Sequence, residues 1–338
     1  MNRRTLLAAA LPLSLTACAP YVLSPLSPGA AFAGPRMETD AFIVQDGARL
    51  PVMRWGPTES DHVFLCLHGI NDSAMSFHYA GPYWAERGVI TYAYDERGFG
   101  GSPGRGMWPG RELMTRDLKT VAALVRARHP HSRIVLVGES MGGAVITCAS
   151  ADDDPPAADG VILLAPAVWG WSTQAIPNRV SLNIAARFAG AAAVEPPEFV
   201  SERILASDNF EELMRMGRDP KQILSTRFDV MYGLVDLMED ASQALGRVRL
   251  PTLLMYGAHD QLVDPAAMRL ALERAGSAPN LTTAFYPNGW HLLHRDLGRE
   301  IVLADALSWM NNPTAPLPSR PMTVPQGLER IAALEQSR

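Results

Sequence analysis

The sequence contains only three cysteines, no internal repeat and no long run of basic residues. None of the cysteines lies at a spacing from histidine that is typical of a zinc site. The net charge of −5, without a basic stretch interleaved with aromatic residues, argues against a nucleic-acid-binding surface. Beyond the first eighteen residues, no apolar stretch is long enough to span a bilayer. These absences argue against a zinc protein, a repeat protein, a nucleic-acid-binding protein and an integral membrane domain.

The composition that is present is that of a folded domain. The chain has 338 residues, of which 47% are hydrophobic and 19% charged. This length and composition fit one large α/β domain with an insertion, or two small domains. Cys66 and Cys148 both lie in apolar runs, which favours buried free thiols; a disulfide between them is the alternative.

Residues 1–18 have the pattern of an export signal. Arg3 and Arg4 precede an apolar stretch from Leu6 to Leu15, which is too short to span a bilayer as a stable helix. The segment ends in LTAC, which resembles the lipobox of bacterial lipoproteins, and the arginine pair resembles a twin-arginine export signal. The resemblance implies lipidation of Cys18, export, and anchoring to a membrane of the bacterial cell envelope. A conventional cleaved signal is the alternative.

The remaining chain divides by composition and periodicity. Residues 19–37 are rich in Pro, Ala, Ser and Gly and predict a tether. Apolar runs of strand length alternate with helical patterns over residues 38–168 and 248–312, which predicts a mostly parallel central sheet flanked by helices. Residues 169–247 contain helical patches and no convincing strand, so we expect an inserted helical cap there. Residues 313–338 form a Pro-rich, loose tail with at most a short helix.

A serine lies at a chemically significant turn. The segment VLVGESMGGAVI places Ser140 between Gly138 and Gly142, where an apolar run ends and a helical stretch begins. The bare G-x-S-x-G motif is weak evidence, but on a strand-to-helix turn the serine hydroxyl projects above the sheet. The helix N-terminus behind the turn favours negative charge in front of it. This setting predicts that Ser140 is a nucleophile; an ordinary glycine-rich turn is the alternative.

A serine nucleophile needs a base, and the base needs a carboxylate to orient it. His291 lies on a loop after the last predicted strand, and Asp260 follows the strand before it. The carboxyl ends of parallel strands meet at one edge of a sheet, so we expect these side chains to lie together. His294 is the alternative base. Asp264 is the alternative acid, although its position before Pro265 also suits a helix cap.

The tetrahedral intermediate of such a reaction needs two backbone donors for its oxyanion. We expect one from the N–H of Met141, which follows the nucleophile, and one from the N–H of Ile70 in the HGIND loop. His68 in this loop is expected to hold the loop in place rather than to act in catalysis.

The order serine, aspartate, histidine along the chain is that of α/β-hydrolases. Five segments, HGINDSAMSF, YDERGFGGSPGRG, GESMGGA, YGAHDQLVDP and YPNGWHLLHRDL, resemble the monoacylglycerol lipase and lysophospholipase branch of that superfamily, often grouped with serine aminopeptidase S33 domains. The resemblance implies the α/β-hydrolase fold with an inserted cap, the triad Ser140, Asp260 and His291, and no metal or organic cofactor. It also implies hydrolysis of carboxylic esters, such as monoacylglycerol or lysophospholipid, at a membrane surface reached through Cys18.

Two features of the predicted cap bear on the substrate. The apolar stretch from Val180 to Val194 is expected to line an acyl pocket or face lipid, or else to pack the cap on the core. The alternative activity is an S33 aminopeptidase, which needs an anionic group to hold the amino terminus of its substrate. The acidic candidates in the cap are Glu195, Glu198, Glu202, Glu211 and Glu212, although a solvated surface also explains them.

A third interpretation is a non-catalytic binding or scaffold protein that has kept the fold. Such a protein would lack a member of the triad, and none is missing from this sequence.

Overall fold

The computed structural model of the chain describes residues 19–195 and 204–336. Cys18, the predicted lipidation site, lies outside the described residues, as do Glu198 and Glu202. Across the described ranges, no helix combines the length and the apolar character that crossing a bilayer requires.

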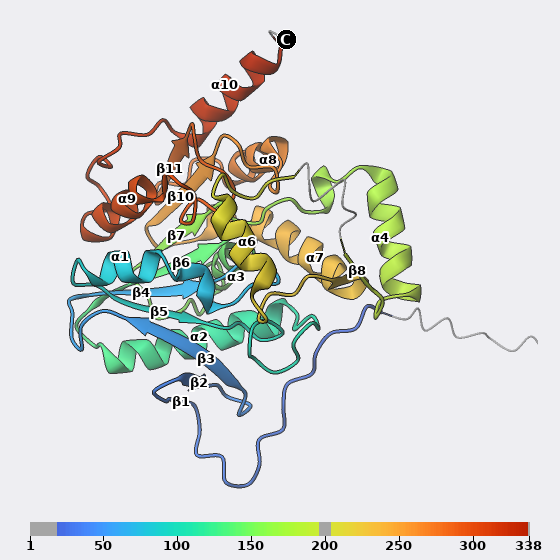
Figure 1. Cartoon of the computed structure of the whole chain (residues 1–338), viewed down its shortest axis with the longest axis vertical. Coiled ribbons are helices and arrows are strands. Elements are labelled where there is room, and N and C mark those ends of the chain that lie inside the picture. Colours follow the sequence, from blue (N-terminus) through green and yellow to red (C-terminus); the bar gives the residue numbers. More distant parts are fainter. Residues whose placement is uncertain (1–18, 196–203, 337–338) are drawn as a thin grey trace, which may run out of the picture.

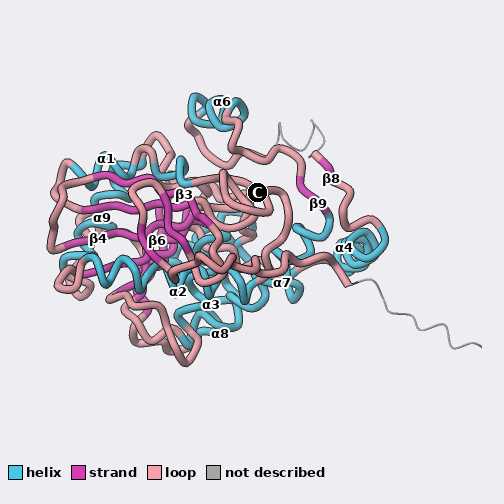
Figure 2. The backbone as a smooth tube through the Cα atoms, turned by 90° about the horizontal axis from the view of Figure 1, so that it is seen from below, coloured by secondary structure: helices cyan, strands magenta, loops and turns pink. Residues whose placement is uncertain are grey.

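A nine-stranded sheet forms the centre of the molecule (Figures 1 and 2), in the order β1-β2-β3-β5-β4-β6-β7-β10-β11. The strands are β1 (Arg36–Met37), β2 (Ala41–Ile43), β3 (Arg49–Trp55), β4 (His62–Leu67), β5 (Ile90–Tyr94), β6 (Arg133–Glu139), β7 (Gly160–Leu164), β10 (Thr252–Gly257) and β11 (Leu281–Tyr286). All neighbours from β5 to β11 in this order pair in parallel, whereas β1, β2 and β3 pair antiparallel at one edge. The prediction of a mostly parallel sheet is confirmed.

Helices cover both faces of the sheet. One face carries α2 (Arg111–Arg128), α3 (Met141–Ser150) and α8 (Pro265–Ala275), and the other carries η1 (Ala74–Phe77), α1 (Ala80–Ala85) and α9 (Arg299–Asn311). Alternate side chains of β4 belong to different clusters: Leu65 and Leu67 pack on the first face, Phe64 and Cys66 on the second. A strand buried on both faces needs a continuous apolar run, which is the pattern of this segment.

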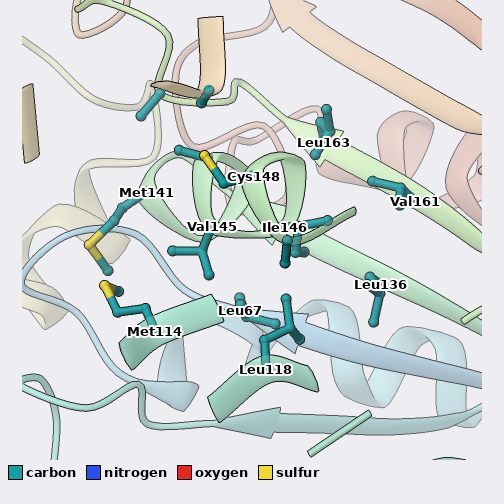
Figure 3. Close-up of a cluster of buried hydrophobic side chains, with 14 of the residues drawn as sticks. Leu67, Met114, Leu118, Leu136, Met141, Val145, Ile146, Cys148, Val161 and Leu163 are labelled. Carbon is teal, nitrogen blue, oxygen red and sulfur yellow. The ribbon is translucent and has the colours of Figure 1, made fainter. Parts of the chain in front are cut away.

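Helix α3 is anchored by apolar packing along its length. Figure 3 shows Val145 and Ile146 of α3 among Leu67 of β4, Leu136 of β6 and Leu118 of α2. Full burial of each such side chain stabilises the fold by about 1.5–3 kcal/mol. The packing therefore holds the N-terminus of α3, next to Ser140, in a fixed position above the sheet.

The two described cysteines are buried free thiols, as the apolar sequence around them favours. Cys66 lies in the apolar cluster on one face of the sheet and Cys148 in the cluster on the other, which is why they form no disulfide. Burial raises the pKa of both thiols, that of Cys148 to about 12, so neither is a reactive thiolate at neutral pH.

The insertion between β7 and β10 is mainly helical. Its described elements are η2 (Trp171–Thr173), α4 (Ile176–Phe188), β8 (Ala193–Val194), α6 (Phe210–Arg218), β9 (Thr226–Arg227), α7 (Phe228–Ala244) and η3 (Leu245–Arg247). The expectation that this region contains no strand is wrong, because β8 and β9 pair antiparallel. Each has only two residues, too few to leave a periodic signal. Helix α7 packs on α3 and α8, whereas α4 lies at the edge of the molecule far from the sheet (Figures 1 and 2).

Both terminal segments contact the core. In the predicted tether, the Leu23 N–H donates to the Trp108 carbonyl at 2.8 Å, and the Leu26 N–H donates to Asp46 Oδ2 at 2.8 Å. This part of the segment therefore lies along the domain surface. In the tail, Met322 bridges to Phe285 of β11, and α10 (Val324–Gln336) follows. The tail is more ordered than its proline content suggests, because Val324 and Leu328 are buried against the sheet edge.

Candidate active site

Ser140 occupies a sharp turn between β6 and α3. Its backbone dihedral angles, φ of 49° and ψ of −113°, are values that residues other than glycine rarely adopt. A Cβ on Gly142 would lie 2.5 Å from the Leu67 carbonyl oxygen, and one on Gly138 would lie 2.5 Å from the Gly143 nitrogen. Both glycines are thus required by the close approach of α3 to β4 and β6. Ser140 is 9% exposed, so its hydroxyl lies in a confined space at the edge of the sheet.

Asp260 and His291 are hydrogen-bonded to each other. They follow β10 and β11, which pair in parallel, and Asp260 Oδ2 lies 2.9 Å from His291 Nδ1. The other carboxylate oxygen of Asp260 accepts from the backbone N–H groups of Leu262 and Val263, at 2.8 and 2.9 Å. Because the carboxylate accepts the Nδ1 proton, the lone pair of His291 is on Nε2. This tautomer is the one a general base for Ser140 needs.

The surroundings of His291 stabilise its protonated form. Burial lowers the pKa of His291, but the charge and hydrogen bond of Asp260, with a contribution from Glu139, outweigh burial and raise the pKa above its ordinary value. A base with this environment accepts a proton readily and holds it as an imidazolium beside the carboxylate.

The structure gives His294 and Asp264 other partners. His294 Nε2 donates to the Ser76 carbonyl at 3.1 Å and its ring stacks on Phe77, and burial holds its pKa well below the usual value. Asp264 accepts from the Ala266 N–H at 2.7 Å and so caps α8, the second role that its position before a proline suggested. Neither residue competes with Asp260 and His291 in this arrangement.

The loop that carries His291 packs directly against the turn that carries Ser140. Arg295 in this loop forms an ion pair with Glu139, the residue before the serine, at 2.6 Å. Among the described residues, no hydrogen bond joins the Ser140 hydroxyl to His291. Such contacts commonly tighten only when substrate binds. The structure thus brings the predicted acid and base into contact and places the predicted nucleophile beside their loop; the catalytic roles of the three stay a prediction.

The loop after β4 passes next to Ser140. A Cβ on Gly69 would lie 3.4 Å from the Ser140 Cβ, and the Gly142 N–H donates to the His68 carbonyl at 3.1 Å. Within the part of the chain that the structure describes, the N–H groups of Ile70 and Met141 donate no hydrogen bond to protein. Both are therefore available for an oxyanion, as the predicted roles require.

His68 holds this loop in place. Its Nε2 accepts from the Glu96 N–H at 2.9 Å, which puts the ring proton on Nδ1, and Nδ1 donates to the Gly69 carbonyl at 2.8 Å. Both ring nitrogens are occupied by backbone groups, so the imidazole links two loops instead of acting on a substrate.

A buried cluster of charges beside the triad has no counterpart in the sequence analysis. We call it the Arg295 cluster; it consists of Arg295, Glu139, Asp72 and Glu212, and their side chains are all almost fully buried. The only sequence signal for it is the arginine in the segment WHLLHRDL, which mixes polar and apolar residues. Nothing in that segment identifies the three carboxylates, which lie far away along the chain.

Comparison with known proteins places the chain among hydrolases. The family described as serine aminopeptidase, S33, matches residues 58–298. The monoacylglycerol lipase of Mycolicibacterium smegmatis is 24% identical over 277 residues, which cover 80% of this chain and 95% of that protein. The monoglyceride lipase of Rattus norvegicus is 25% identical over 287 residues, covering 82% of this chain and 92% of that protein.

Solved structures share the fold. A soluble variant of monoglyceride lipase from Saccharomyces cerevisiae superposes with a TM-score of 0.65 at 18% identity, covering 86% of this chain and 100% of that one. The monoacylglycerol lipase of Paleococcus ferrophilus has a TM-score of 0.63 at 19% identity, covering 77% and 98%. These matches confirm the predicted α/β-hydrolase fold. With the family match over 58–298, they establish that this chain belongs to the serine aminopeptidase S33 family of α/β-hydrolases.

Proposed function

We propose that this protein is a serine hydrolase that cleaves carboxylic esters with a single acyl chain, such as monoacylglycerol or lysophospholipid. The observation that carries the proposal is the 2.9 Å contact between Asp260 and His291, in a loop packed against the strained turn of Ser140. Distant relatives described as monoacylglycerol and monoglyceride lipases support the ester class.

The geometry suits an acyl-enzyme mechanism. His291 Nε2 removes the hydroxyl proton as Ser140 Oγ attacks the ester carbonyl, and Asp260 stabilises the imidazolium. The N–H groups of Ile70 and Met141 stabilise the oxyanion. The intermediate collapses when the imidazolium protonates the leaving alcohol, which leaves the acyl group on the serine. Water, deprotonated by the same imidazole, then attacks the acyl-enzyme. The acyl–Oγ bond breaks, the imidazolium returns its proton to Ser140 Oγ, and the carboxylic acid is released.

The aminopeptidase alternative has less support. The buried acidic candidate in the cap, Glu212, is already paired with Arg215 through two hydrogen bonds of 2.8 Å, and it also faces Arg295. It therefore has no free oxygen directed to a substrate amine. Glu211 and Glu195 are exposed, which agrees with a solvated surface.

A panel of matched substrates tests the proposal. Purified protein is assayed with short-chain nitrophenyl esters, monoacylglycerol and lysophospholipid in mixed micelles, and aminoacyl arylamides. We expect ester cleavage to dominate, with covalent labelling by a fluorophosphonate probe. Arylamide cleavage faster than ester cleavage would establish the aminopeptidase instead, and failure to react with the probe would contradict both activities.

Helix α4 supports action at a lipid surface. Four apolar side chains spaced by four residues form one exposed stripe, and only Ala186 of the helix is buried. The stripe consists of Ile176, Val180, Ile184 and Phe188, which are 72, 53, 54 and 86% exposed. The helix also carries Arg179 and Arg187 and no acidic residue. This combination suits a helix lying in the interface of an anionic membrane, and we propose that it acts together with a lipid on Cys18.

Two substitutions test the membrane proposal. Cys18→Ser in the full chain is expected to move the protein from the membrane fraction to the soluble fraction of a bacterium that processes lipoproteins.

Phe188→Glu should lower activity on vesicle-borne monoacylglycerol about 10-fold, because the variant loses about 1.5–3 kcal/mol of apolar burial in the membrane. Its activity on soluble nitrophenyl acetate should be unchanged. Ile301→Glu, on the exposed side of α9, is the matched control; an equal effect of both glutamates would contradict a role for α4.

A further inference from the structure

Arg295 links three parts of the molecule that are distant in sequence. Its guanidinium is 0% exposed and lies in the His291 loop. One nitrogen lies 2.6 Å from Glu139 of the turn that carries Ser140, which we call the nucleophile turn. The same nitrogen lies 2.8 Å from Asp72 of the HGIND loop after β4, which we call the oxyanion loop. The other nitrogen lies 3.4 Å from Glu212 of cap helix α6.

We propose that Arg295 is a positioning residue that couples the seating of α6 to the assembly of the catalytic centre. Through the Arg295 cluster, the nucleophile turn, the oxyanion loop and the His291 loop take up their working arrangement together with α6. This inference rests on the proposed ester hydrolysis and assigns to that reaction a residue outside the triad.

Helix α6 is held over the site by polar contacts. Glu212 is its one buried residue among those described, whereas Phe210 and Met214 are exposed. Leu213 and Met216 are half-buried but belong to neither apolar cluster of the sheet, so the seating of α6 depends mainly on its charges and hydrogen bonds. Figure 1 shows the helix at the carboxyl end of the parallel strands, the edge where ligand sites of such sheets lie.

The segment before α6 is tied to the same loop. The Asn209 side-chain amide donates to the Arg295 carbonyl at 2.9 Å, and the Ser207 hydroxyl donates to Asp296 at 2.6 Å. The Leu292 N–H donates to the Ala206 carbonyl at 2.9 Å. A displacement of α6 therefore pulls on the loop that carries the predicted base.

The charge of Arg295 holds the nucleophile turn and the oxyanion loop together. Glu139 and Asp72 both approach one nitrogen of Arg295, so without the guanidinium these two buried carboxylates repel each other. The nucleophile turn and the oxyanion loop would then separate. A displacement of about 1 Å in such groups lowers a catalytic rate about 100-fold.

The charges around His291 supply a diagnostic signature. Glu139 raises the pKa of His291 and Arg295 lowers it. The other titratable groups facing the imidazole or the cluster are Asp260, His294, Asp296, Asp72, Glu212, His78 and Arg215. None of these other charges is removed when either Glu139 or Arg295 is changed, and the two removed charges have opposite signs, so the two substitutions should shift the pKa of His291 in opposite directions. Damage to packing alone would not produce opposite shifts.

The decisive variant is Glu212→Gln, which keeps the shape of the side chain and removes its charge. Its matched control is Asp117→Asn. Asp117 lies on α2, outside the Arg295 cluster, and its carboxylate is 2.8 Å from another buried arginine, Arg97. We expect Glu212→Gln to lower kcat on nitrophenyl esters about 10- to 100-fold with KM changed less than about 3-fold. Asp117→Asn should leave kcat within about 2-fold. Equal kcat in the two variants would overturn the proposal.

The pH profile and backbone exchange complete the test. Arg295→Gln should raise the midpoint of kcat/KM against pH, and Glu139→Gln should lower it; shifts in the same direction would contradict the proposal.

Hydrogen exchange of the backbone amides tests the coupling of α6 to the oxyanion loop without a substrate. In Glu212→Gln, amides of α6 and of residues 70–75 should exchange faster together, while those of α2 should not. Loss of protection in α6 alone would show that α6 and the oxyanion loop are not coupled, whereas an inactive wild type with coupled exchange would refute only the proposed function.

Discussion

Replacing Ser140 with alanine is expected to lower kcat for ester hydrolysis by about 10⁵- to 10⁶-fold, because no other group can form the acyl-enzyme. Alanine tolerates the turn as well as serine does, since the strained backbone and the flanking glycines are unchanged. The melting temperature should therefore stay close to that of the wild type. Turnover of nitrophenyl esters and monoacylglycerol measures the effect, and fluorophosphonate labelling should be lost in parallel.

Ser150 provides the matched control for this variant. It lies buried at the C-terminal end of α3, so Ser150→Ala changes a serine of the helix that follows Ser140 without touching the site. We expect full activity and full probe labelling. Undiminished turnover in Ser140→Ala would end the proposal of a serine hydrolase, whatever the control shows.

Asp260→Asn should lower kcat by about 10⁴-fold. An asparagine amide can donate to His291 Nδ1, which would put the ring proton on Nε2, where the lone pair is needed for Ser140. The loss should exceed that from any substitution in the Arg295 cluster, because it leaves His291 in the tautomer that cannot accept the serine proton. Asp264→Asn is the control, since asparagine caps α8 as well as aspartate does and activity should remain.

Asp260→Asn should also shift the pH midpoint of the activity, in a direction that follows from the charges around His291. The wild-type rate should rise with pH through the raised pKa of His291, because only the neutral imidazole accepts the serine proton. Burial lowers this pKa and Asp260 raises it. Removing the Asp260 charge leaves burial less opposed, so the midpoint of the residual activity should move to lower pH. A midpoint that stays in place or rises would argue against His291 as the base.

These expectations depend on a centre whose acid, base and oxyanion loop are held by hydrogen bonds from other parts of the chain. Asp260 is fixed by two backbone N–H groups, and His68 bridges two loops through both ring nitrogens. The strained turn at Ser140 is held by the apolar packing of α3 on the sheet, which Figure 3 shows. Rigid support of this kind is what keeps donors and base aligned before the substrate arrives.

The amino-acid sequence alone was enough to predict the alternation of strands and helices and the turn at Ser140. Both are local properties: a strand buried on two faces needs a continuous apolar run, and a helix packed this closely on a strand needs Gly138 and Gly142. Because parallel strands end at one edge, chain order alone also predicted that Asp260 and His291 would lie together.

Other features were decided only by the tertiary structure. Packing gave His294 other partners, put Cys66 and Cys148 on opposite faces of the sheet, and exposed the apolar stripe of α4. The Arg295 cluster is the clearest case, since Arg295 and Glu139 are 156 positions apart. Local periodicity records which side of an element is buried, but the pairing of distant charges depends on how whole elements pack, and no short stretch of sequence contains that information.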